Sequence, residues 1–143
     1  MTGVLLDDHL IRDLLADDLG EDLRQLLAEY EPATTNLYLY RLSRSVVAAP
    51  GGRLTGSWGI EERRALGSRL VALPEEIEVV PMRLLAFAMA EISAAHRVST
   101  LGAEAVAAAV HLGVPLCVWE GDDGPGIRSA VEELGASYRV LTR

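Results

Sequence analysis

Residues 101–121, LGAEAVAAAVHLGVPLCVWEG, decide the fold class of this chain. Residues 103–112 are nearly all small and apolar, which predicts a helix that is buried on most of its surface. Gly113 stands where helices often end, because glycine adopts the left-handed conformation of a helix C-cap without strain. Residues 114–119 follow at once as an apolar run of strand length. A helix leading directly into an apolar strand predicts a parallel sheet with helices on both faces.

The start of the chain shows a related pattern. Residues 4–6 are apolar, Asp7, Asp8 and His9 follow, and residues 10–15 have the periodicity of a helix. Ligands bind at the carboxyl ends of the strands in parallel sheets, and both Asp7 and the acidic run at 120–123 lie at such ends. Acidic side chains in these places are also favoured by the dipole of the following helix, and they cap free N–H groups without any ligand. His9 fits a surface or capping residue more simply than a ligand.

The rest of the chain predicts further helices and short strands. The expected helices cover 21–30, 37–47, 60–73, 82–96 and 127–134, and the expected strands cover 77–80 and, at a sheet edge, 137–141. Residues 34–36 fit either a short extended piece or a helix cap, and the Gly-rich residues 49–59 predict a flexible loop. We therefore expect one domain over residues 1–143, of α/β class, with three α/β/α layers and a central, mainly parallel sheet of about five strands.

The composition limits the classes of function. All 13 basic residues are arginine, and 21 acidic residues leave a net charge of −8, which argues against non-specific nucleic-acid binding but allows a local arginine-lined groove. The apolar runs are too short to span a membrane, and no signal-peptide pattern opens the chain. The single Cys117 excludes an internal disulfide. These features predict a cytoplasmic protein that has no membrane partner.

Residues 5–15, LLDDHLIRDLL, resemble the opening strand and helix of the PIN domain, the fold of many bacterial toxin ribonucleases of the VapC type. In that family an aspartate at this place begins a metal site, and Asp7 stands there. Residues 103–118 resemble the family's Ala-rich helix, which leads through Gly-x-Pro-Leu into a strand. The resemblance extends over nearly the whole chain in order and length.

The resemblance implies metal-dependent phosphodiester hydrolysis, in which three or four carboxylates hold Mg²⁺ or Mn²⁺ and activate a water molecule. Asp7 would be the first acid and Glu120 the fourth, with Asp122 close behind, so we predict Asp7 and Glu120 as catalytic residues and all three as metal ligands. The second position falls at Arg41, and the third falls near Gly102. An arginine would compete with the metal for the carboxylates, and we expect Arg41 to be a charge partner within the site.

Three interpretations follow. The leading hypothesis is a divergent PIN-like protein with a degenerate metal site, or none, that acts through binding in a toxin–antitoxin-like or regulatory pair. The rival is an active Mg²⁺-dependent endoribonuclease whose missing acids come from Glu91 or Glu104, and the third is an α/β domain of other ancestry. By the resemblance, the partners are an antitoxin-like protein, RNA and a second copy in a homodimer. An active nuclease needs at least three carboxylates near Asp7, whereas the binding role predicts an arginine there.

Overall fold

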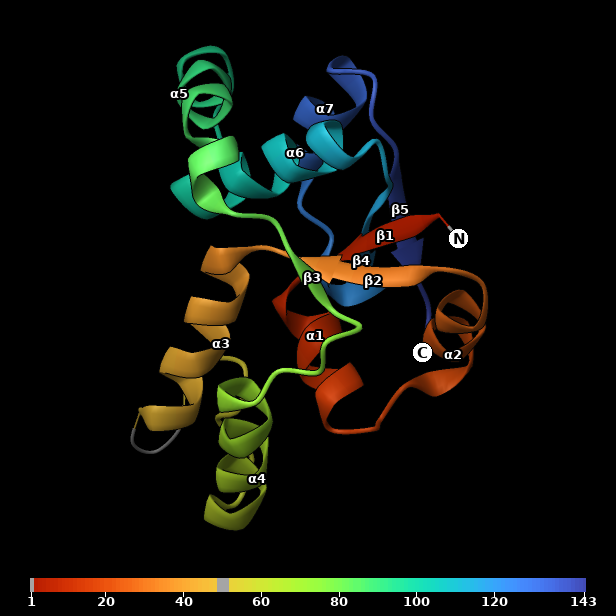
Figure 1. Cartoon of the computed structure of the whole chain (residues 1–143), viewed down its shortest axis with the longest axis vertical. Coiled ribbons are helices and arrows are strands. Elements are labelled where there is room, and N and C mark those ends of the chain that lie inside the picture. Colours follow the sequence, from red (N-terminus) through yellow and green to blue (C-terminus); the bar gives the residue numbers. More distant parts are fainter. Residues whose placement is uncertain (1, 49–51) are drawn as a thin grey trace.

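The computed structural model describes residues 2–48 and 52–143, in which helices and strands alternate along most of the chain (Figure 1). The strands are β1 (Gly3–Leu6), β2 (Glu31–Thr34), β3 (Glu78–Val79), β4 (Leu116–Trp119) and β5 (Tyr138–Leu141). The α-helices are α1 (Asp8–Leu15), α2 (Gly20–Glu29), α3 (Asn36–Val47), α4 (Ile60–Val71), α5 (Ala86–Ala95), α6 (Thr100–Leu112) and α7 (Pro125–Glu133). Two short 3₁₀ helices are η1 (Met82–Leu84) and η2 (Glu120–Asp122). The loop expected over 49–59 lies partly outside the described residues.

The five strands form one sheet in the order β3-β2-β1-β4-β5, and every neighbouring pair is parallel. The predicted α/β class with a parallel sheet of five strands is therefore confirmed. The chain builds β1, β2 and β3 toward one edge and then returns to place β4 on the other side of β1. The direction of strand addition thus reverses between β1 and β4. In open parallel sheets the ligand-binding crevice forms at such a reversal, outside the carboxyl ends of the strands.

The side chains of β1 alternate between two apolar cores, one on each face of the sheet. Leu5 packs with residues of α5, α6 and α7, whereas Val4 and Leu6 pack with residues of α1, α2, α3 and α4. Figure 1 shows α6 and α7 on one side of the sheet and α1 on the other. Because all three residues are fully buried, β1 is the centre of a three-layer structure, as predicted.

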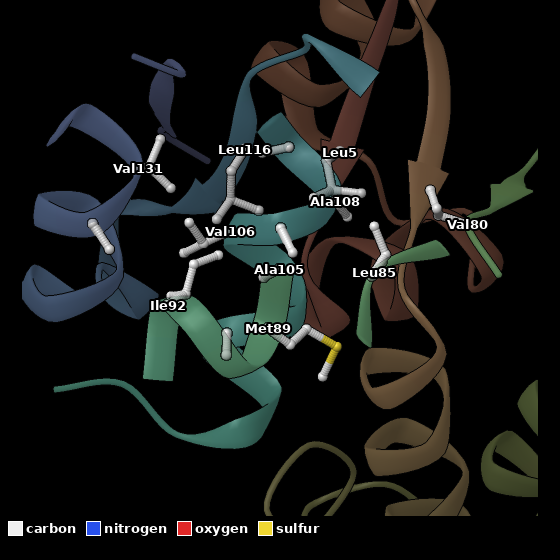
Figure 2. Close-up of a cluster of buried hydrophobic side chains, with 14 of the residues drawn as sticks. Leu5, Val80, Leu85, Met89, Ile92, Ala105, Val106, Ala108, Leu116 and Val131 are labelled. Atoms are coloured by element: carbon white, nitrogen blue, oxygen red, sulfur yellow. The ribbon is translucent and has the colours of Figure 1, made fainter. Parts of the chain in front are cut away.

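Helix α6 is buried on most of its surface, as the sequence predicts. Every residue from 102 to 109 is buried. Val106 belongs to the same core cluster as Ile92 of α5, Leu116 of β4 and Val131 of α7, and these side chains lie around it in Figure 2. The helix ends at Gly113, whose φ of 67° lies in the left-handed region. The small side chains of α6 thus let other elements pack closely on most of its sides.

Three local predictions needed correction. Strand β2 was not clearly predicted, because Pro32 lies within it; the strand ends at Thr34, and the Thr35 side chain then accepts a hydrogen bond from the Tyr38 N–H at 3.2 Å as the N-cap of α3. Gly20 is also a residue at which the sequence favours the end of the first helix, but that helix ends at Leu15 and Gly20 begins α2. The helix expected over 82–96 is divided into η1 and α5.

None of the helices in the described part of the chain is long and apolar enough to cross a membrane.

Candidate metal centre

Asp7 lies at the carboxyl end of β1, beside β4, and is the N-cap of α1. Its Oδ1 accepts a hydrogen bond from the Leu10 N–H at 2.9 Å, and its own N–H donates to the Cys117 carbonyl of β4 at 3.3 Å. The residue is only 4% exposed. These contacts fix one carboxylate at the point where the strand order reverses, and they leave its second oxygen available for another partner.

Asp7, His9 and Asp122 form a group that could hold a metal ion, because one ligand atom from each lies within 4.8 Å of the others. His9 Nε2 is 3.4 Å from Asp122 Oδ1, and His9 Nδ1 is 3.7 Å from Asp7 Oδ2. The Asp122 side chain is 28% exposed, so the group is accessible from solvent. The sequence pointed to Asp7 and Asp122, whereas His9 was missed because a single histidine in a helix's first turn carries no specific signal.

The group lines a hollow of about 300 Å³ at the ends of β1 and β4, which we call the acidic hollow. Its polar walls are the carboxylates Asp7, Asp8, Asp122 and Asp123, the arginines Arg41 and Arg53, and His9 and Tyr138; apolar walls include Leu101 and Ile127. Two arginines thus face the same space as four carboxylates. Such a hollow has negative groups for a cation and positive groups for an anion that accompanies it.

Arg41 lines the acidic hollow, and its ion-pair partner is Asp8. Arg41 Nε is 3.2 Å from Asp8 Oδ2, and His9 Nδ1 is 3.2 Å from Asp8 Oδ1. The Asp8 side chain is only 2% exposed, while that of Arg41 is 37% exposed. Asp8 Oδ2 and His9 Nδ1 are nevertheless buried atoms without a hydrogen bond to any described residue. Buried polar atoms are normally satisfied, so these two mark a place suited to a ligand.

The carboxylates alter the protonation of the site. Burial alone would lower the pKa of His9, but the close contacts and charge interactions with Asp7 and Asp8 outweigh it and raise the pKa to about 9. Burial raises the pKa of Asp7, and contacts with His9 and the Leu10 N–H oppose that rise. At neutral pH His9 is therefore an imidazolium between carboxylates. A divalent ion that uses the His9 nitrogen has to replace its proton.

The remaining acids of the 120–123 run lie around the group and not within it. Glu120 is exposed in η2 and lines a neighbouring hollow with Arg12, so its role as a ligand stays a prediction. Asp123 accepts a hydrogen bond from the Tyr138 hydroxyl at 2.9 Å and pairs with Arg128 at 3.0 Å. Asp123 is thus held at the wall of the acidic hollow by β5 and α7.

Glu104 and Glu91, the two acids that could have completed a nuclease site, lie elsewhere. Glu104 is fully buried, and its carboxylate accepts hydrogen bonds from the Leu37 N–H at 2.8 Å and the Asn36 side-chain amide at 2.9 Å. Glu104 therefore stabilises the N-terminal end of α3. Glu91 is exposed on α5 and lines a separate apolar groove of about 570 Å³.

The place expected for the third acid is closed by packing. Gly102 is buried, and a Cβ on it would lie only 3.2 Å from the Ile127 side chain and 3.3 Å from the Val98 side chain. An aspartate at this position would require both neighbours to move, so the wall near Gly102 is apolar. The close contact between α6 and α7 therefore leaves too little room for an acidic side chain at this position.

Comparison of the chain with models of known protein families gives no match, and comparison with curated proteins gives none at a significant level. The plain finding is a five-stranded, all-parallel α/β sheet flanked by helices, with an Asp/His group at the carboxyl ends of its central strands.

Proposed function

We propose that this protein is a divergent PIN-like domain with a reduced metal site, and that it acts mainly through binding, in a toxin–antitoxin-like or regulatory pair. The observation that carries the proposal is Arg41, which lies in the acidic hollow with its guanidinium 3.2 Å from Asp8. A nuclease of this type would have another acid there. The arginine neutralises a carboxylate that would otherwise attract the metal.

The PIN-like assignment is supported by residues that are distant in the sequence but lie close together in the structure. The positions assigned to the four family acids are far apart in the sequence, and two of them, Asp7 and Arg41, line the acidic hollow. The other two, Gly102 and Glu120, do not line it, but the nearby Leu101 and Asp122 do. Leu101 stands next to Gly102, and Asp122 lies two residues past Glu120. All neighbouring strands are parallel, whereas an antiparallel sheet would have favoured other ancestry.

The residues of the site fit a divalent ion, though not Mg²⁺ best. Asp7, His9 and Asp122 would hold it. The described residues provide no hydrogen bond to the buried Asp8 Oδ2 and His9 Nδ1 atoms, which leaves both atoms able to bind a ligand. Mg²⁺ prefers oxygen ligands alone, while an imidazole suits transition metals, so we expect Mn²⁺ or Zn²⁺ to bind more tightly than Mg²⁺. When bound, such an ion would polarise a phosphate oxygen and acidify a bound water.

An active ribonuclease is the second candidate, and the composition of the hollow favours it. Four carboxylates line the hollow together with Arg41 and Arg53, and this combination could hold a metal and a phosphodiester side by side. Two of these carboxylates also have structural roles, which argues against a ribonuclease: Asp7 caps α1, and Asp123 pairs with Arg128. Glu104, moreover, is committed to α3.

A cleavage assay separates the two candidates. Single-stranded RNA oligonucleotides of mixed sequence would be incubated with Mn²⁺ and either the parent protein or Asp122→Asn, which removes a partly exposed ligand without a structural hydrogen bond in the described residues. The binding role predicts the same background cleavage for both proteins. Cleavage by the parent that Asp122→Asn abolishes, in a protein that stays folded by circular dichroism, would establish the ribonuclease instead.

A further inference from the structure

Asp8 is a buried carboxylate for which the described structure provides only a partial charge partner. Its side chain is 2% exposed, and its Oδ2 makes no hydrogen bond. The Arg41 Nε atom is close enough for attraction, at 3.2 Å, but the contact lacks hydrogen-bond geometry. Because a buried carboxylate without full compensation is costly, a better partner for Oδ2 would stabilise this arrangement.

The position of Asp8 is suitable for a cation ligand. It lines the acidic hollow with Asp7, His9 and Asp122, and its Oδ1 lies 3.2 Å from Nδ1 of His9, a member of the three-residue group. Asp8 is not one of the three residues of that group, but it contacts the group through His9. A hard divalent ion gains from each added carboxylate oxygen, both in charge and in coordination number.

Arg41 is the residue that stands between Asp8 and this role. Its side chain is 37% exposed, so the guanidinium can turn toward solvent without opening the core. While it stays beside Asp8, it places a positive charge within the wall of the same hollow. A divalent ion entering the hollow then meets repulsion from the guanidinium and one carboxylate fewer.

We propose that Asp8 is a further ligand of this cation site and that Arg41, by pairing with Asp8, keeps the site weak. The inference rests on the proposed metal site and adds to it the residue that sets its affinity. It predicts that removal of the arginine charge strengthens metal binding, and that the gain depends on the Asp8 carboxylate.

The test is a calorimetric titration of Mn²⁺ into five folded proteins: the parent, Arg41→Gln, Arg41→Lys, Arg44→Gln and the double variant Arg41→Gln/Asp8→Asn. Arg44 lies on the same helix and is exposed, so Arg44→Gln measures the general effect of one lost charge. We expect Arg41→Gln to bind Mn²⁺ about tenfold more tightly than the parent, against less than about twofold for Arg44→Gln. Arg41→Lys keeps the charge and should stay close to the parent.

The double variant decides the part played by Asp8. If Asp8 is the ligand that Arg41 holds back, most of the tenfold gain disappears in Arg41→Gln/Asp8→Asn. A gain that survives in the double variant would overturn Asp8 as a ligand, and an Arg41→Gln affinity equal to the parent's or to that of Arg44→Gln would overturn the inference altogether. Failure of Mn²⁺ to bind any of the five proteins is a different result, because it would remove the proposed metal site itself.

Discussion

At the scale of single residues, the protonated imidazole of His9 provides a positive charge among the carboxylates of the acidic hollow. The pKa of its imidazole is raised from 6.5 to about 9 by Asp7 and Asp8, against the effect of burial. Because the folded-state pKa lies above the unfolded one, the protonated form stabilises the fold fully below about pH 6.5, and this contribution is lost as the pH rises through about 9.

We therefore expect the free energy of unfolding, measured by urea titration in EDTA, to fall by about 1 to 2 kcal/mol between pH 6.5 and 9, after allowance for solvent screening. His9→Gln should remove this decline, while His111→Gln, an exposed histidine on α6, should keep it. Equal pH profiles for the parent and His9→Gln would show that His9 is not held by the carboxylates.

Glu104 is the other residue whose role is structural and testable. Glu104→Ala would leave the Leu37 N–H without its side-chain acceptor, would leave the Asn36 amide with the Val80 carbonyl alone, and would open a cavity in a fully packed region. We expect a loss of about 3 kcal/mol or more in chemical denaturation. Glu91→Ala, at an exposed site on α5, should cost less than about 0.5 kcal/mol.

The residue scale also shows what the sequence could predict. Asp7 and Arg41 were placed in the site by the resemblance, since they stand at fixed points after β1 and within α3. His9 and Asp8 were not assigned to it, because their roles depend on side-chain directions in the first turn of α1. The capping role of Glu104 joins residues separated by 67 and 68 positions, and such a contact has no local sequence signal.

At the scale of elements, the helix–glycine–strand unit of α6 and β4 makes a clear prediction. Gly113 has a φ of 67°, and a Cβ on it would meet nothing within 4 Å, so only backbone strain opposes a side chain. Gly113→Ala should lower the free energy of unfolding by about 1 kcal/mol.

Gly121 is the matched control for this change. A Cβ there would also meet nothing within 4 Å, but the φ of Gly121 is not positive. Gly121→Ala should therefore change stability by less than about 0.5 kcal/mol. If both substitutions had equal effects on the urea midpoint, the left-handed cap would not be the cause.

The same unit explains why the fold class could be predicted when some elements could not. The small apolar residues of α6, the glycine that ends the helix and the strand length of the apolar run ending in Trp119 can all be recognised from the local sequence. Strand β2 contains Pro32 and is defined by its pairing with β1 and β3, which is a tertiary feature. Tertiary pairing therefore overrides the weak local preference at that strand.

At the scale of the whole molecule, α5 has an apolar surface that the residues described in the structure leave exposed. The helix AFAMAEISAA is apolar almost all round, yet only Met89 and Ile92 are buried, and Phe87 is 79% exposed. A helix that is apolar on every side is normally buried. We propose that a second copy of the chain covers this surface, in the homodimer that the PIN resemblance implies.

We accordingly expect a dimer in sedimentation velocity experiments and a shift to monomer in Phe87→Glu. Val71→Glu is the comparison, because Val71 is 91% exposed on a different helix, α4. A parent protein that sediments as a monomer at every concentration, or equal effects of the two substitutions, would count against a dimer through α5.

The most direct test of the account as a whole is calorimetric titration of Mn²⁺ into the parent protein and into Asp122→Asn. We expect one weak site in the parent, with a Kd of about 100 µM or weaker, that Asp122→Asn removes. Binding of two ions at micromolar concentrations would contradict a reduced site and would point to a complete nuclease centre. Heat that Asp122→Asn leaves unchanged would place the metal somewhere other than the acidic hollow.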